Sequence, residues 1–299
     1  MDEATKTSGG EGVKTPAMSR RDLLKAGLGS LGLVGVCNVL TGCATGSEAL
    51  GVPGSFAPAT KALGAKRWGL VVDVARLSEQ GTFAHMLAAC HTSHNVPSID
   101  DRRIEVKWIW QDDFEHSFAD IANGYTSQSL RQLAVPVLCN HCNEPVCVRV
   151  CPTQATFKRA DGIVDMDYHR CIGCRFCMTA CPYNARSLNF CDPRPYLDEI
   201  NPAYPIRSKG VVEKCTFCAE RIEQGLAPLC VEASNGALIF GDLSDASSDV
   251  RKVLHERFAV CRRAELGTEP SIYYLLAPAA GDVSGAVSEG GGGNAGKGV

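Results

Sequence analysis

The cysteines are the residues of this chain whose type and spacing could do chemistry, because a thiolate binds soft metal ions and can also be oxidised to a disulfide. The 299-residue sequence contains 16 of them. One run has the spacing C-x2-C-x2-C-x3-C-P and consists of Cys171, Cys174, Cys177, Cys181 and Pro182. This spacing lets three thiolates contact one [4Fe–4S] cluster while the fourth binds a second cluster. It therefore predicts paired iron–sulfur clusters rather than a zinc site or a disulfide framework.

A second run of cysteines lies upstream, with two residues added before its third cysteine. Its members are Cys139, Cys142, Cys147 and Cys151. Exchange of the fourth ligand between the two runs produces two complete ligand sets. Cluster A would be bound by Cys139, Cys142, Cys147 and Cys181. Cluster B would be bound by Cys171, Cys174, Cys177 and Cys151.

Two further runs have lost cysteines in a correlated way. One keeps three cysteines but has Ser234 at its fourth position. The other, aligned through the similarity of residues 73–77 to residues 167–171, has Leu77, Gln80 and Phe83 at its first three positions and keeps only Cys90. All ligands of one cluster are therefore missing, whereas its companion, cluster C, has a full set: Cys90, Cys215, Cys218 and Cys230. We predict three [4Fe–4S] clusters in total.

Four cysteines remain outside these sets. Cys37 and Cys43 precede the first run, while Cys191 and Cys261 match no cluster spacing and are predicted to be buried free thiols. His141 and His169 lie beside predicted ligands, where they either tune reduction potentials or are ordinary loop residues.

The N-terminal segment has the features of an export signal. Arg20 and Arg21 lie in a stretch, residues 19–25, that resembles the twin-arginine signal, and a short apolar segment follows. That segment is shorter than the roughly 20 residues of a membrane-spanning helix, so it predicts a signal peptide and a periplasmic protein. Residues 40–43 resemble a lipobox, in which Cys43 would carry the lipid; ordinary signal-peptidase cleavage nearby is the alternative.

The expected organisation follows from these motifs. Residues 1–43 form the signal peptide with its lipobox, residues 44–66 a linker, and residues 279–299 a disordered glycine-rich tail. Residues 136–205 form a dicluster ferredoxin module with an insertion, and residues 67–135 with 206–278 form a degenerate module with one cluster. Strands are expected at 69–74, 162–166 and 237–240. The predicted fold is α+β, built from two pseudo-symmetric bacterial dicluster-ferredoxin modules with loop-rich insertions.

Charge and side-chain types exclude several functions. The formal net charge is −3, which does not favour a nucleic-acid partner. The sequence contains no Ser-His-Asp, paired-carboxylate or phosphate-loop arrangement. We therefore expect a protein that carries electrons and is not itself an enzyme.

The region from about Arg67 to Leu275 resembles the iron–sulfur subunits of molybdopterin oxidoreductases and NrfD-associated complexes, the NrfC/PsrB/DmsB-like family. Within that family it is similar to the DsrO-type periplasmic subunits of Dsr transmembrane complexes of sulfur metabolism. The similarity rests on the cysteine runs and on residues 107–110, 191–195, 230–234 and 265–274. It implies a respiratory electron-transfer subunit with three kinds of partner: an integral NrfD-type membrane subunit that exchanges electrons with quinone, cytochrome subunits and other iron–sulfur subunits. Membrane association would occur through that partner and a lipid on Cys43.

Three other functions are considered. The first is an electron-transfer subunit of a periplasmic molybdopterin oxidoreductase of the tetrathionate, polysulfide or nitrite type. Loss of one cluster would shorten the electron path of such a relay, so the Dsr-type relay is preferred. The others are a free periplasmic ferredoxin and a structural protein stabilised by disulfides.

Overall fold

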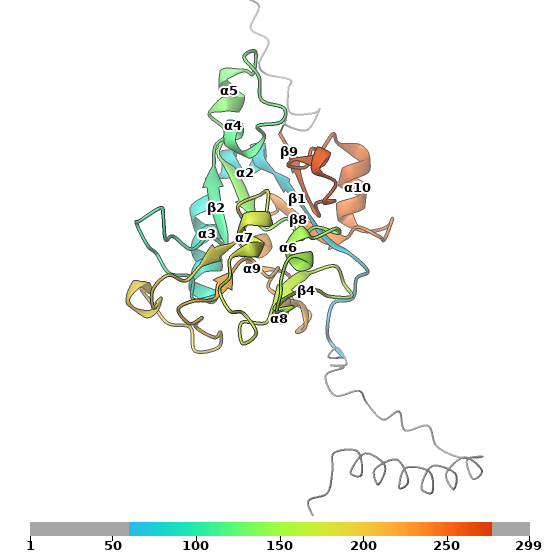
Figure 1. Cartoon of the computed structure of the whole chain (residues 1–299). Helices are drawn as coiled ribbons and strands as arrows, with labels where there is room; N and C mark the ends of the chain where they lie inside the picture. Colours follow the sequence, from blue (N-terminus) through green and yellow to red (C-terminus); the bar gives the residue numbers. More distant parts are fainter. Residues whose placement is uncertain (1–59, 277–299) are drawn as a thin grey trace, which may run out of the picture. The chain divides into compact units, whose positions relative to one another are not determined.

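The computed structural model describes residues 60–276 (Figure 1). The predicted signal peptide with Cys37 and Cys43, most of the predicted linker and the glycine-rich tail lie outside the described residues. The described end of the linker contacts the body of the protein, because the Leu63 N–H donates to the Ile222 carbonyl at 2.9 Å and the Lys66 N–H donates to the Asp242 carboxylate at 2.9 Å.

A three-stranded sheet joins segments far apart in the sequence. Its order is β8-β1-β9, from β8 (Leu238–Asp242), β1 (Trp68–Asp73) and β9 (Ile272–Leu275) (Figure 1). β1 is antiparallel to β8 and parallel to β9. Side chains alternate between the two faces of a strand, so Leu70 and Val72 pack into the main core while Val71 packs with Val250 beneath α10 (Asp249–Glu256). Both faces of β1 are therefore covered.

Two helices follow β1 without a long loop. The Asp73 carboxylate accepts the backbone N–H of Arg76 and caps α2 (Val74–Gln80), which ends at Gly81 in the left-handed conformation. α3 (Phe83–Ser93) comes next and buries Met86 and Cys90. Positions 77, 80 and 83, which align with a cysteine loop, thus lie in helices α2 and α3. Without a cluster to surround, this segment can satisfy its backbone hydrogen bonds within helices.

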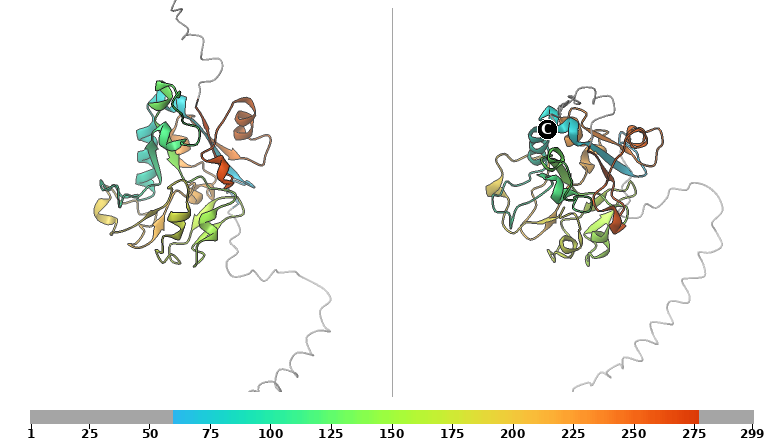
Figure 2. Two further views of the ribbon diagram at one scale, coloured as in Figure 1. Left: turned by 45° about the horizontal axis from the view of Figure 1, so that its top comes forward. Right: turned by 90° about the horizontal axis from the view of Figure 1, so that it is seen from above.

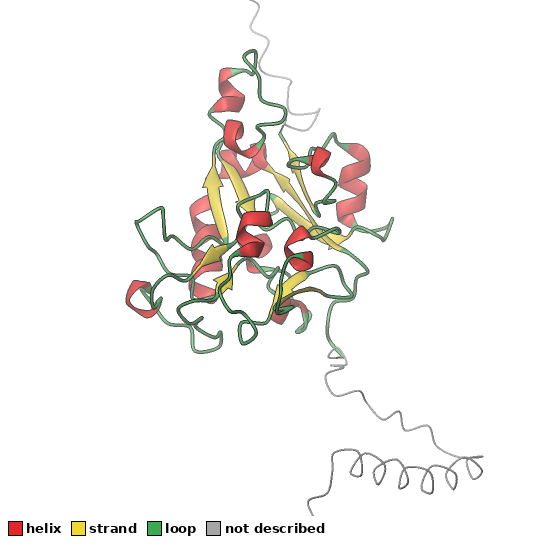
Figure 3. Ribbon diagram, in the orientation of Figure 1, coloured by secondary structure: helices red, strands yellow, loops and turns green. Residues whose placement is uncertain are grey.

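The rest of the body consists of three two-stranded sheets and short helices joined by loops, as Figure 3 shows. The strand pairs are β2 (Ile109–Asp112) with β3 (Val135–Leu138), β4 (Thr156–Lys158) with β5 (Val164–Met166), and β6 (Ser187–Leu188) with β7 (Val212–Glu213). The helices are α4 (Phe114–Ser117), α5 (Gln128–Arg131), α6 (Val146–Arg149), α7 (Phe176–Ala180), α8 (Ala219–Ile222) and α9 (Leu229–Ala233). Two 3-10 helices are η1 (Arg194–Tyr196) and η2 (Ala264–Leu266). In both views of Figure 2, η1 and α10 lie on opposite sides of the body.

The mixture of helices and strands confirms the coarse α+β prediction, and β1, β5 and β8 coincide with the three expected strands to within two residues at each end. The two-module pseudo-symmetry and the predicted domain bounds stay predictions. None of the helices within residues 60–276 is long and apolar enough to span a membrane.

A buried ion pair connects α3 to β7. Arg207 and Glu213, which are 3% and 0% exposed, lie 2.6 Å apart. The carboxylate also accepts the Trp108 indole N–H at 2.7 Å, while the guanidinium donates to the Asn95 carbonyl at 2.8 Å, just after α3. Because Cys90 is on α3 and Cys215 follows β7, this network holds two of the predicted ligands in place.

We expect Glu213→Gln to destabilise the protein. Breaking a buried pair leaves Arg207 uncompensated, which costs about 3–5 kcal/mol and lowers the melting temperature by on the order of 10 °C for a chain of this size. Circular dichroism of the cluster-loaded protein measures this shift. Glu256→Gln, at an exposed site on α10, is the control and should stay within about 0.5 kcal/mol. Equal melting temperatures for the two variants would contradict the structural role of the pair.

Candidate iron–sulfur cluster sites

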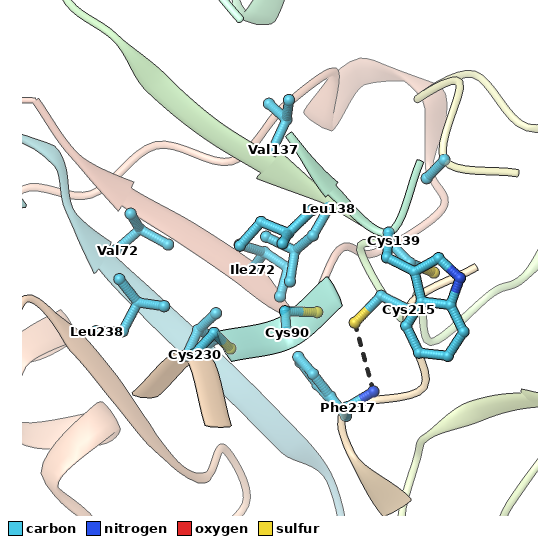
Figure 4. Packing of buried hydrophobic residues seen from close by; sticks show 14 of the residues in the cluster. Val72, Cys90, Val137, Leu138, Cys139, Cys215, Phe217, Cys230, Leu238 and Ile272 are labelled. Atoms are coloured by element: carbon cyan, nitrogen blue, oxygen red, sulfur yellow. Dashed lines mark hydrogen bonds between the residues drawn. The ribbon is translucent and has the colours of Figure 1, made fainter. Parts of the chain in front are cut away.

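The structure brings together the four cysteines predicted for cluster C, here called group C. Cys90 comes from α3, Cys215 follows β7, Cys218 caps α8 and Cys230 lies on α9. All four line one cavity with apolar side chains, among them Trp108. Figure 4 shows Cys90, Cys215 and Cys230 reaching a common region of the apolar core from three segments. Each of the four is at most 7% exposed, so water has little access to the sulfurs.

Burial makes group C unable to hold four thiolates without cations. It raises the pKa of Cys90 well above its usual range, and the charges of the other three thiolates raise it further. Burial likewise raises the pKa of Cys230 to about 11. The sulfurs are thus thiols until a metal displaces their protons. Four soft donors around an apolar cavity fit a [4Fe–4S] cluster, which is held by four cysteine thiolates.

The cysteines predicted for cluster A, group A, also lie together. Cys139 follows β3, Cys147 is on α6 and Cys181 follows α7. Burial raises the pKa of Cys142 to about 12, with further increases from the charges of Cys139, Cys147 and Cys181. Cys139, Cys142 and Cys181 also belong to the main core cluster, whereas Cys147 packs against a second core cluster.

Group B contains Cys151, Cys171, Cys174 and Cys177, which line a second cavity. Three of its cysteines are half-buried, and the neighbouring side chains Ile172 and Phe176 are 67% and 59% exposed. Gly173 is in the left-handed conformation, where an added Cβ would lie 2.2 Å from the Gly210 carbonyl oxygen. Only glycine therefore fits at position 173, within the loop that carries the cysteines of group B.

Backbone N–H groups reach the sulfurs of group B. The Val212 N–H donates to the Cys171 sulfur at 3.4 Å. Burial opposes ionisation of Cys151, but backbone N–H groups of Thr156, Thr153 and Ala155 and the Thr153 hydroxyl outweigh it and lower the pKa of that thiol. Hydrogen bonds to sulfur stabilise the charged ligand and raise the reduction potential of a cluster.

The three groups form a series with group A in the middle. The charge of Cys139 acts on Cys215 of group C, and both residues belong to the same core cluster. Cys147 packs in a second core cluster with Cys171 and Cys177 of group B, and its charge acts on Cys177. Group A is thus electrostatically coupled to both of the other groups.

The positions aligned with the ligands of the missing cluster, residues 77, 80, 83 and 234, present no thiol. Leu77 is 2% exposed in the main core. The Arg76 guanidinium donates to the Asn235 carbonyl at 3.2 Å, which places α2 against the end of α9. The Ser234 hydroxyl donates to the Val231 carbonyl at 2.7 Å and accepts the Leu238 N–H at 3.0 Å. Both of these hydrogen bonds of the hydroxyl are therefore with backbone groups.

Cys191 and Cys261 are free thiols, as expected, but both are only half-buried, so their predicted burial was wrong. His169 is exposed, whereas His141 is buried and stacks on Phe217 with ring centroids 4.0 Å apart. Burial, with smaller contributions from Lys214 and Arg186, holds the pKa of His141 well below its usual range. The histidine is therefore neutral between groups A and C.

Sequence reasoning missed two buried cations near the sulfurs, Arg186 and Lys214, which are 5% and 0% exposed. The available signal was their position: Arg186 follows Cys181 by five residues, and Lys214 immediately precedes Cys215. Basic residues beside clustered thiolates compensate negative charge.

Comparisons with known proteins agree with the chemistry of these groups. The 4Fe-4S dicluster domain family matches residues 130–191. The chain is 41% identical over 230 residues to the Hdr-like menaquinol oxidoreductase iron-sulfur subunit 1 of Archaeoglobus fulgidus, covering 70% of this chain and 83% of that protein. It is 35% identical over 235 residues to the menaquinone reductase iron-sulfur cluster-binding subunit of Nitratidesulfovibrio vulgaris, covering 70% and 88%. It is 42% identical over 152 residues to a subunit of the tetrathionate reductase of Salmonella typhimurium, covering 50% and 54%.

The fold and the cysteine groups define a protein of the [4Fe–4S] dicluster class. The chain belongs to the family of iron–sulfur electron-transfer subunits of respiratory oxidoreductase complexes, which are not the catalytic subunits of those complexes.

We expect Cys90→Ala to affect one cluster. If groups A, B and C each bind a cluster, the wild-type chain contains about twelve irons, and the variant loses about four, or about one if a three-iron cluster remains. Iron analysis and electron paramagnetic resonance measure this change, and the signals of the other two clusters should be unaltered. Cys191→Ala is the control, with unchanged iron and spectra. Full iron content and an unaltered spectrum in Cys90→Ala would show that Cys90 is not a ligand.

Proposed function

We propose that this chain relays electrons through three [4Fe–4S] clusters in the order B, A, C. The ligands are the members of the three cysteine groups defined above. The observation that carries the proposal is the packing of group A against both other groups: Cys139 shares the main core cluster with Cys215, and Cys147 packs with Cys177 in a second core cluster. Group B, which lies beside the exposed side chains of Ile172 and Phe176, is suited to exchange electrons with a partner. The buried group C is suited to hold them away from water.

The complex that we propose is a Dsr-type respiratory complex of sulfur metabolism. In it the chain would connect an NrfD-type integral membrane subunit, which interacts with quinone, to cytochrome and iron–sulfur subunits. Two relatives support a quinone link, since they are named as subunits of a menaquinol oxidoreductase and a menaquinone reductase. The absence of thiols from residues 77, 80, 83 and 234 supports a three-cluster relay over the four-cluster relay of molybdoenzymes.

A second candidate is an electron-transfer subunit of a periplasmic molybdopterin oxidoreductase. The specific support for it is the 42% identity to the tetrathionate reductase subunit and the 45% identity over 157 residues to the iron-sulfur subunit of a putative dimethyl sulfoxide reductase of Halobacterium salinarum. Both matches cover about half of this chain, 50% and 52%.

Affinity purification from detergent-solubilised membranes distinguishes the two functions. A tagged chain should copurify with an NrfD-like subunit and a cytochrome or iron–sulfur subunit, and the complex should contain haem or additional iron but no molybdenum. Recovery of a molybdopterin-containing subunit with stoichiometric molybdenum would support the second candidate. A monomer that remains in the soluble fraction would contradict both.

We also propose that the chain is exported with its clusters and is lipidated at Cys43. Replacing both Arg20 and Arg21 by lysine should leave a cluster-loaded precursor in the cytoplasm, because the twin-arginine route exports folded proteins. Cell fractionation and immunoblotting measure this change, and normal periplasmic levels would contradict the proposal. Mass spectrometry of the mature N-terminus tests lipidation separately, with Cys43→Ala as the unacylated control.

A further inference from the structure

Arg186 is a buried cation without a carboxylate partner in the part of the chain that the structure describes. Its side chain lies just before β6 and is 5% exposed. A guanidinium keeps its charge inside a protein, and burying it without an opposite charge is unfavourable. Of the other buried arginines, Arg207 pairs with Glu213 at 2.6 Å, and Arg262 donates to the Ser117 carbonyl at 3.0 Å. Arg186 differs from both because its guanidinium lies against a cysteine sulfur.

The two arms of the guanidinium point to two different cysteine groups. The Nη2 atom donates to the sulfur of Cys147, a member of group A, at 3.1 Å. The Nη1 atom donates to the Thr156 hydroxyl at 3.0 Å and lies 3.3 Å from the sulfur of Met166. Thr156 and Met166 both line the cavity of group B together with Cys177. One rigid cation thus spans the space between the groups.

The thiolates of both groups act on this cation. Burial alone would lower the pKa of Arg186, but the charges of Cys147, Cys177, Cys139 and Cys181 outweigh burial and raise it. Three of these cysteines belong to group A and one, Cys177, belongs to group B. The missing counter-charge of Arg186 is therefore supplied by the ligands themselves.

We propose that Arg186 is an electrostatic link between groups A and B that raises the reduction potentials of both clusters. A cluster becomes more negative when it accepts an electron, so a nearby fixed positive charge favours its reduced form, and the hydrogen bond to Cys147 adds to this effect at group A. Group C does not share the link. The inference rests on the proposed function in one respect, the assignment of clusters to groups A and B. Arg186 is a tuning residue and is not a ligand.

Potentiometric titration of the cluster-loaded chain, followed by electron paramagnetic resonance, tests the link. Arg186→Gln keeps a hydrogen-bond donor but removes the charge, so two of the three potentials should shift to more negative values while the third, that of group C, stays in place. Arg186→Lys keeps the charge, so its potentials should stay close to those of the wild type. Because the site is buried, the shift should be similar at about 0.1 M and about 1 M salt, unlike an effect of an exposed charge.

Arg159→Gln is the matched control. This arginine is 25% exposed and is already paired with Asp161 and Glu223, so its loss should leave all three potentials unchanged. If Arg186→Gln does not retain its iron, Thr156→Asp takes its place. A carboxylate against the Nη1 atom neutralises the guanidinium without removing it, and the same two potentials should become more negative.

Three unmoved potentials in a variant with full iron would overturn the proposal, and so would an equal shift of all three, which indicates a general structural change. Failure of the proposed function has a different signature. In that case the wild-type chain itself would lack the iron and the spectra of clusters at groups A and B, whatever residue occupies position 186.

Discussion

The burial of negatively charged sulfur ligands is the constraint on which the rest of this structure depends. Thiolates are unfavourable in an apolar interior, and the raised pKa of Cys90 and of Cys142 expresses that cost. The protein offsets it with metal ligation, with N–H donors such as that of Val212, and with the buried cations Arg186 and Lys214. The short helices and two-stranded sheets are suited to this task, because their ends present cysteines and backbone N–H groups to a shared cavity.

The region that aligns with the missing cluster contains no buried thiolates, and its packing differs accordingly. Without thiolates to stabilise, the chain has closed the space with helices α2 and α3 and with apolar packing around Leu77 and Met86. Ser234 retains the place of a ligand in the alignment, yet its hydroxyl is engaged by the backbone of α9 and β8. Removal of a complete ligand set therefore leaves a well-packed core, whereas removal of single ligands would leave buried, uncompensated polar groups.

Much of the candidate site could be predicted because cluster motifs are local. The spacing of residues 171–181 indicates the cofactor, and the exchange of fourth ligands predicts which distant cysteine joins each group, including Cys90. Short apolar runs located β1 and β8. The helices α2 and α3 were not predicted, because their residues were aligned with a cysteine loop. The half-burial of Cys191 and Cys261 was missed because unpaired cysteines are usually buried, and burial depends on neighbours from the whole fold.

The sequence by itself determined the type of cofactor and the grouping of its sulfur donors, since these depend on donor chemistry and on spacing within a few residues. Only the tertiary structure decided which group lies in the middle and which charges act on it. Arg186 contacts Cys147 across 39 positions of the chain, and Arg207 reaches Asn95 across 112. Contacts of this range depend on how the sheet and the short helices pack together. Packing is a property of the whole body, so no local pattern of residues encodes it.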